Sequence, residues 1–190
     1  MKPFSLLFLA CLLAITASAQ EAKTNAPAEL KKTGTAVPAV ALSDAQAPGI
    51  TFPASAGVIS APFVLTNGYL YQPGAQTEVN GGGKAIYSFT ITNAGNYVIH
   101  AVVNAPAMES NSFYLNVDAP PEDPTMIWDI EVTTGFVDRV VSWRGDGSDT
   151  EDQFVPKRFN LATGMHKLII YGREPDTQLK TLSIRPADAR

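Results

Sequence analysis

The sequence predicts an all-β domain, a sandwich or barrel of short antiparallel strands. Polar and apolar residues alternate with period two, most cleanly in residues 84–92. Ala85, Tyr87, Phe89 and Ile91 lie on one face of that stretch, with Lys84, Ser88 and Thr90 opposite. Gly, Pro and Asn residues separate stretches of this kind, and no stretch shows a helical apolar period over three turns.

Ten stretches fit short strands, and each is bounded by turn residues. In chain order they are residues 57–65, 69–72, 84–92, 97–103, 112–118, 126–130, 136–143, 154–161, 165–171 and 179–184. Asn93 to Asn96 reads as a hairpin turn between two of them. Trp128 shares its strand face with Met126 and Ile130 at period two, so we expect it in the core.

The N-terminal residues predict export. A lysine and an apolar run precede Ala17-Ser18-Ala19, a small-x-small cleavage site, so residues 1–19 read as a signal peptide. Cleavage as a lipoprotein at Cys11, the sole cysteine, is a weaker alternative. Residues 20–47 contain no aromatic residue and read as a flexible linker, which leaves residues 48–190 as one domain. We therefore expect a secreted or periplasmic protein.

Charge argues against two classes of partner. The formal net charge of the chain is −4, and residues 48–190 hold 15 acidic and 10 basic residues. Because no basic patch appears, we expect neither nucleic acid nor an anionic membrane as a partner. We expect a monomer.

Four local patterns in the later part of the domain resemble the carbohydrate-binding modules of families 6 and 35, in the galactose-binding-like superfamily. They are the hairpin 94–99, the strand 111–118, the turn and strand 159–168, and the ending Gly172-Arg173-Glu174 with Leu179. The resemblance implies a jelly-roll β-sandwich of two antiparallel sheets that binds a polysaccharide or glycan.

The resemblance also implies a calcium site, but this chain departs from the pattern. Residues 50–55 lack the acidic residue of the first strand, and Lys180 stands where the last strand has an aspartate. A hard cation needs six to eight oxygen ligands, so we expect no metal there and no cofactor. The acidic residues Asp146, Asp149, Glu151 and Asp152 suggest a solvated loop, with a weak calcium site as the alternative.

Sugar binding needs flat aromatic faces beside rigid hydrogen-bonding groups. Tyr69 and Tyr71 have the same parity and share one face, so they form either a platform or ordinary packing. Trp143 ends a strand just before a loop, where it is either a partly exposed stacking ring or a sandwich-edge residue.

Arg173 and Glu174 lie in the last hairpin. Arg173 could contact vicinal hydroxyls or a uronate carboxylate, and Glu174 could share that site. The alternative, which we favour, is an internal ion pair that anchors the following Pro175-Asp176 turn. His166 lies in a strand and is expected to make a structural hydrogen bond.

These observations favour a non-catalytic carbohydrate-binding module. A cell-envelope module that binds protein rather than sugar is the first alternative. A small glycosidase is the second, and Asp129, Glu131 and Glu174 are the carboxylates available to it.

Overall fold

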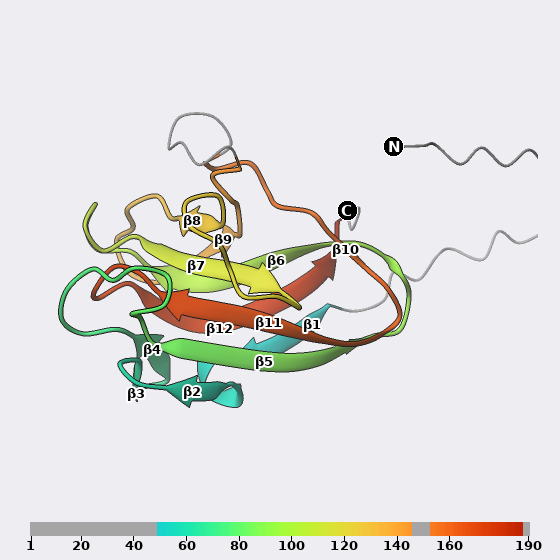
Figure 1. Cartoon of the computed structure of the whole chain (residues 1–190), viewed down its shortest axis with the longest axis horizontal. Helices are drawn as coiled ribbons and strands as arrows, with labels where there is room; N and C mark the ends of the chain where they lie inside the picture. The colour runs from blue at the N-terminus through green and yellow to red at the C-terminus, as the bar shows by residue number, and fades with distance from the viewer. Residues whose placement is uncertain (1–48, 146–152, 188–190) are drawn as a thin grey trace, which may run out of the picture. The chain divides into compact units, whose positions relative to one another are not determined.

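The computed structural model describes residues 49–145 and 153–187. The expected signal peptide, linker and acidic loop lie outside these residues. The described chain folds into two antiparallel sheets stacked on each other, with β5, β11 and β7 in front of β1, β12 and β6 in Figure 1. No helix among the described residues is long and apolar enough to cross a membrane.

The first sheet has seven strands. Its main order is β10 (Phe159–Leu161), β6 (Gly95–Asn104), β12 (Gln178–Pro186), β4 (Tyr69–Tyr71) and β3 (Val64–Thr66). In addition β1 (Ile50–Pro53) pairs with β12, and β9 (Val137–Val140) pairs with β6. A single 3-10 turn, η1 (Ala54–Ala56), connects β1 to the second sheet.

The second sheet has five strands. Its order is β2 (Val58–Ser60), β5 (Lys84–Ile91), β11 (Gly164–Gly172), β7 (Ser112–Val117) and β8 (Ile127–Asp129). The two-sheet sandwich expected from the alternating pattern is therefore confirmed.

The core lies between the two sheets, where alternate residues of the central strands are buried. The four β5 residues expected on one face, Ala85, Tyr87, Phe89 and Ile91, are all buried, as their period-two spacing predicts. Trp128 is 1% exposed and contacts Phe113 with 6.1 Å between ring centroids, so its predicted core position is confirmed. Strand β11 is buried on both faces, because Tyr114, Ile127, Ile169 and Tyr171 form a second cluster outside the main core.

Three of the expected strands are too long. Residues 57–65 form β2 and β3, which belong to different sheets because a turn at Ala61-Pro62 separates them and Pro62 has no N–H to donate to a ladder. In residues 154–161 only β10 is a strand, and Pro156 makes a single bridge with Ser142. Of residues 136–143, only those of β9 form a strand.

His166, at the start of β11, makes the structural hydrogen bonds expected of it. Its Nδ1 lies 2.6 Å from Oδ2 of Asp118, and its Nε2 lies 2.9 Å from the carbonyl oxygen of Ala162. Both ring nitrogens face acceptors, so the doubly protonated ring is the form that satisfies both. The hydrogen bond with Asp118 raises the pKa of His166 above its ordinary value of 6.5.

We expect this contact to make the free energy of unfolding depend on pH. A pKa raised by folding contributes stability that is fully present below the unfolded value of 6.5 and is lost as the pH rises through the folded value. The free energy of unfolding of the native chain should therefore exceed that of His166→Gln by more at pH 5.5 than at pH 8.5. Urea denaturation at both pH values measures it, and an equal or reversed difference would contradict the assignment.

Candidate functional site

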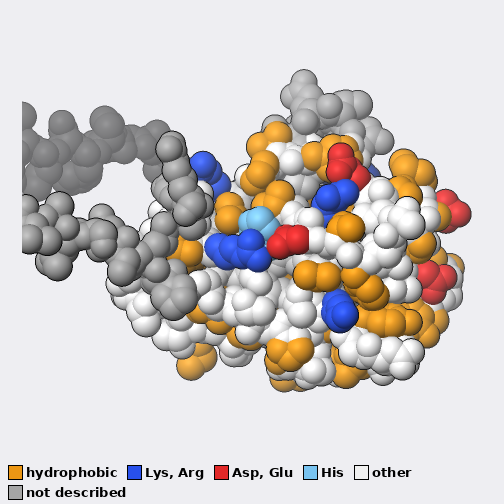
Figure 2. Space-filling model, turned by 180° about the vertical axis from the view of Figure 1, so that it is seen from behind, with side chains coloured by type: hydrophobic (Ala, Val, Ile, Leu, Met, Phe, Trp, Pro, Cys, Tyr) orange, Lys and Arg blue, Asp and Glu red, His pale blue; other side chains and the backbone are white. Residues whose placement is uncertain are grey.

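Three aromatic side chains lie together on the outer face of the first sheet. Leu70 is fully buried, so its neighbours Tyr69 and Tyr71 point outward, with 5.9 Å between their ring centroids. Phe136, which directly precedes β9 and is 37% exposed, lies 5.6 Å from Tyr69. We call these three residues the aromatic surface. Figure 2 shows hydrophobic side chains gathered beside lysine or arginine groups on the face seen from behind.

Local turns bring these rings into place. Asn67 and Gly68 have φ angles of 47° and 79°, the left-handed conformations that an Asn-Gly hairpin turn requires. This turn joins β3 to β4 and places Tyr69 at the first position of β4. Gly135 has φ of 83° and directs the chain into Phe136, so a side chain from another part of the sequence completes the aromatic surface.

Amide groups and one cation lie next to the aromatic surface. Leu179 of β12 pairs with Leu70 and is fully buried, so Gln178 and Lys180 face outward on either side of it. The side chain of Gln178 accepts a hydrogen bond of 3.1 Å from Asn104 on β6. The Nζ of Lys180 lies 5.4 Å from the ring centroid of Phe136. The surface thus combines flat rings with hydrogen-bonding groups held by two central strands.

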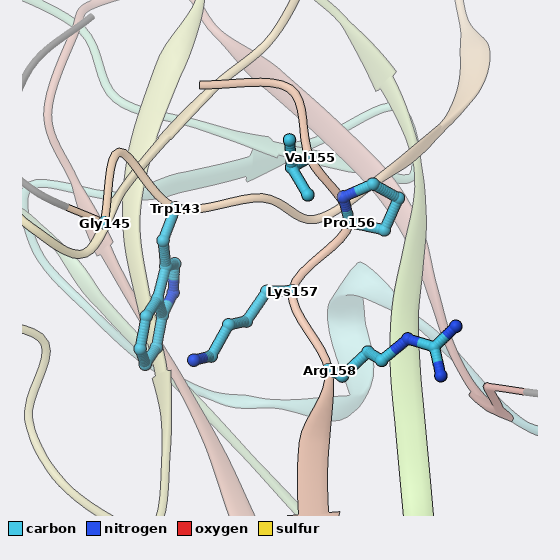
Figure 3. A pocket seen from close by; sticks show the side chains of 6 residues that line it. All are labelled: Trp143, Gly145, Val155, Pro156, Lys157 and Arg158. Atoms are coloured by element: carbon cyan, nitrogen blue, oxygen red, sulfur yellow. The ribbon is translucent and has the colours of Figure 1, made fainter. Parts of the chain in front are cut away.

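Trp143 lies in a separate pocket. Its Nε1 donates to the carbonyl oxygen of Leu115 at 2.9 Å, and its ring meets Phe159 edge to face with 5.6 Å between centroids. The pocket has a volume of about 400 Å³ and is shown in Figure 3. It includes none of the three residues of the aromatic surface. Trp143 is half-buried. Its ring packs against the main core on one side and is partly exposed on the other.

Arg173 and Glu174 form an internal ion pair, which is the arrangement that we favoured. The Nη1 of Arg173 lies 2.6 Å from Oε1 of Glu174, and the two side chains are 13% and 8% exposed. Oε2 of Glu174 accepts a hydrogen bond from the backbone N–H of Asn111, and Arg173 donates to Ser112. The contacts anchor the last hairpin to the start of β7 and leave little of either group for a ligand.

Each of the carboxylates available to a glycosidase lies beside an arginine. Asp129 is 4% exposed and accepts hydrogen bonds of 2.7 Å and 3.1 Å from Arg144. Glu131 is exposed and lies 3.3 Å from Arg139, while Glu174 pairs with Arg173. Glycosidases need two carboxyl groups facing one sugar bond. These three side chains do not form such a pair, since Asp129 and Glu174 have both oxygens engaged within the protein.

Metal-binding side chains do not gather in the part of the chain that the structure describes. No group of three or more His, Cys, Asp or Glu residues within residues 49–145 and 153–187 could hold a metal ion. The possible calcium site at Asp146 to Asp152 remains a prediction, because it lies outside those ranges.

Comparisons with known proteins identify the fold. No family model and no curated protein sequence matches the chain. The GH26-CBM35 β-(1,4)-mannanase of Podospora anserina matches 75% of the chain, with a TM-score of 0.51 and 8% identity. The chain spans 28% of the length of that mannanase. A family 35 carbohydrate-binding module from Clostridium thermocellum matches 74% of the chain and 100% of its own length, with a TM-score of 0.51 and 12% identity.

The chain has the same two-sheet jelly-roll fold as that family 35 module. The fold predicted from the four local patterns is thereby confirmed. Within this jelly-roll fold, Tyr69 and Tyr71 share one surface, Trp143 lines a pocket without them, and Arg173 and Glu174 form a buried pair.

Sequence reasoning missed three side chains near these sites. From the sequence, Phe136 was only the first residue of an expected strand. Lys180 was only the residue that stands in place of a calcium-binding aspartate, and Lys157 was given no role at a site. An aromatic residue directly after a glycine turn is a weak local signal for Phe136. No local signal places it beside Tyr69, which lies far away in the sequence.

Proposed function

We propose that this protein is a non-catalytic carbohydrate-binding module that is exported and binds a polysaccharide or glycan on its aromatic surface. The observation that carries the proposal is the contact of Tyr69, Tyr71 and Phe136 on the outer face of the first sheet. Such rings pack on the apolar face of a pyranose, and their partial exposure leaves area for that contact. A module fold like that of the Clostridium thermocellum protein supports this function.

We assign the recognition of sugar hydroxyl groups to the two amide side chains beside the aromatic surface. Gln178 and Asn104 come from β12 and β6, and their mutual hydrogen bond fixes both side chains beside the rings. Asn104 also accepts a hydrogen bond of 3.1 Å from Thr133, which makes the pair more rigid. Amides held in this way contact sugar hydroxyls with little loss of conformational entropy on binding.

Single replacements on the aromatic surface should weaken glycan retention. We expect Tyr71→Ala and Phe136→Ala each to reduce affinity about fivefold, since an aromatic contact contributes about 1 kcal/mol. Affinity electrophoresis through gels that contain neutral polysaccharides measures the effect. Because both rings are partly exposed, the melting temperature should change by a few degrees at most.

Phe154→Ala is the matched control, because Phe154 is 50% exposed and makes no contact with the aromatic surface among the described residues. Equal retention of Phe136→Ala, Phe154→Ala and the native chain would contradict the assignment of the site. If the native chain binds no glycan but captures an envelope protein that sugars do not displace, the protein-interaction alternative replaces this proposal.

A further inference from the structure

The sequence contains two Asn-Gly pairs, and they lie in different turns of the structure. Asn67-Gly68 joins β3 to β4, with φ angles of 47° and 79°. Asn80-Gly81 lies in the loop that precedes β5. An asparagine side chain reacts most readily with the backbone nitrogen of a following glycine, because glycine has no side chain to shield that nitrogen. The two pairs therefore share one chemistry and differ in their surroundings.

The backbone nitrogens of the two glycines differ in what they contact. The N–H of Gly81 donates to the carbonyl oxygen of Glu78 at 2.8 Å, and a Cβ on Gly81 would lie 3.5 Å from that oxygen. Among the described residues the N–H of Gly68 makes no hydrogen bond, and a Cβ on Gly68 would meet no atom within 4 Å. The nitrogen of Gly68 is thus free to react, whereas that of Gly81 must first lose a hydrogen bond.

The side chain of Asn67 is equally free to move. It is partly exposed, and its amide group makes no hydrogen bond in the ranges that the structure describes. Thr66 and Tyr69 pair across the hairpin, so the two ends of the turn are fixed while its centre is open to solvent. Rotation of the Asn67 side chain toward the nitrogen of Gly68 therefore breaks no polar contact.

We infer that Asn67 is a site of spontaneous deamidation in the folded protein. The backbone nitrogen of Gly68 attacks Cγ of Asn67 and forms a C–N bond. The bond from Cγ to the side-chain nitrogen breaks, and ammonia leaves with the proton of the Gly68 N–H. Water then opens the resulting succinimide at one of its two carbonyl carbons, which yields aspartate or isoaspartate. Water is the sole co-reactant, and either product carries a negative charge that the amide lacked.

The modification changes the chain beside the aromatic surface, and this consequence rests on the proposed function. In isoaspartate the main chain runs through the former side-chain carbons and is therefore longer. A longer main chain no longer fits the two-residue turn that sets the register of β3 and β4. Tyr69 follows this turn directly and contacts both Tyr71 and Phe136. We expect retention on neutral polysaccharide to fall as the protein ages.

Peptide mapping by mass spectrometry compares the two asparagines in one sample. The purified protein is incubated at mildly alkaline pH, and each Asn-Gly peptide is followed for the conversion of asparagine to aspartate or isoaspartate. We expect Asn67 to react about tenfold faster than Asn80, because the hydrogen bond of the Gly81 N–H must first break. In concentrated urea the two sites should react at similar rates, because both turns are then lost.

Two glycine variants connect the modification to the aromatic surface. Asn67→Gly removes the reactive amide and keeps the left-handed backbone that the turn requires, so its retention should not change during the incubation. The native chain, once modified at Asn67, should be retained about fivefold less, the size of one lost aromatic contact. Asn80→Gly is the matched control and should lose retention as the native chain does.

Equal rates at Asn67 and Asn80 in the folded protein, or a faster reaction at Asn80, would overturn the assignment of the site. Native protein that is modified at Asn67 and retained as well as fresh protein would overturn the effect on the aromatic surface. If fresh protein binds no glycan while Asn67 still reacts faster than Asn80, the proposed function fails and the modification site stands.

Discussion

Replacing Glu174 by alanine should lower the free energy of unfolding by about 3–5 kcal/mol, the cost of breaking a buried ion pair from one side. The guanidinium of Arg173, 13% exposed, would remain without its carboxylate, and the backbone N–H of Asn111 would lose its acceptor. Both losses weaken the contact between the last hairpin and β7. Because that hairpin joins β11 of one sheet to β12 of the other, the change should destabilise both sheets. Urea denaturation at pH 7 measures the change.

The double variant Arg173→Met/Glu174→Leu is the matched control. It removes both charges and keeps apolar volume, so it should recover most of the lost stability. A loss below about 1 kcal/mol in the single variant, the size expected of an exposed pair, would contradict the anchoring role. If the folded Glu174→Ala chain lost glycan retention without losing stability, the pair would instead be part of a binding site.

Replacing Gly172 by alanine should be similarly damaging. A Cβ on Gly172 would lie 2.0 Å from Oε1 of Gln72 and 2.7 Å from its Cδ. Gln72 is fully buried, and it cannot move without cost, because Oε1 accepts from Gly83 at 2.8 Å and Nε2 donates to Thr77 at 3.1 Å. We expect a loss of about 3–5 kcal/mol, from overpacking together with broken buried hydrogen bonds.

Gly95→Ala is the control for this prediction. Its Cβ would meet one atom, Cε2 of Tyr97, at an ordinary distance of 4.0 Å. Both glycines lie in strands, so the effect of replacing glycine by alanine on strand propensity is the same in the two variants. The remaining difference in stability between the variants therefore measures the steric conflict at residue 172. Thermal melting should separate the two variants by about 10 °C or more. Similar melting temperatures would show that Gln72 moves aside at little cost.

The aromatic surface and the pocket at Trp143 differ in how much of each could be predicted from the sequence. Tyr69 and Tyr71 lie two residues apart on one strand, so period-two alternation was enough to place them on the same face. Phe136 joins them across two intervening strands, because β9 pairs with β6, β6 with β12 and β12 with β4. Trp143 was recognised as a partly exposed ring, but its lysine was not, since Lys157 follows a second chain segment after residue 152.

The sequence by itself determined the class of fold and most of the core. Alternation in residues 84–92 and around Trp128 is a local property, because successive side chains of any strand point to opposite faces. The tertiary structure alone decided that β2 and β3 lie in different sheets, and that Glu174 also accepts a hydrogen bond from the backbone N–H of Asn111. It also decided which distant residues share a surface. Such contacts depend on strand order and register between segments far apart in the chain, which no local pattern encodes.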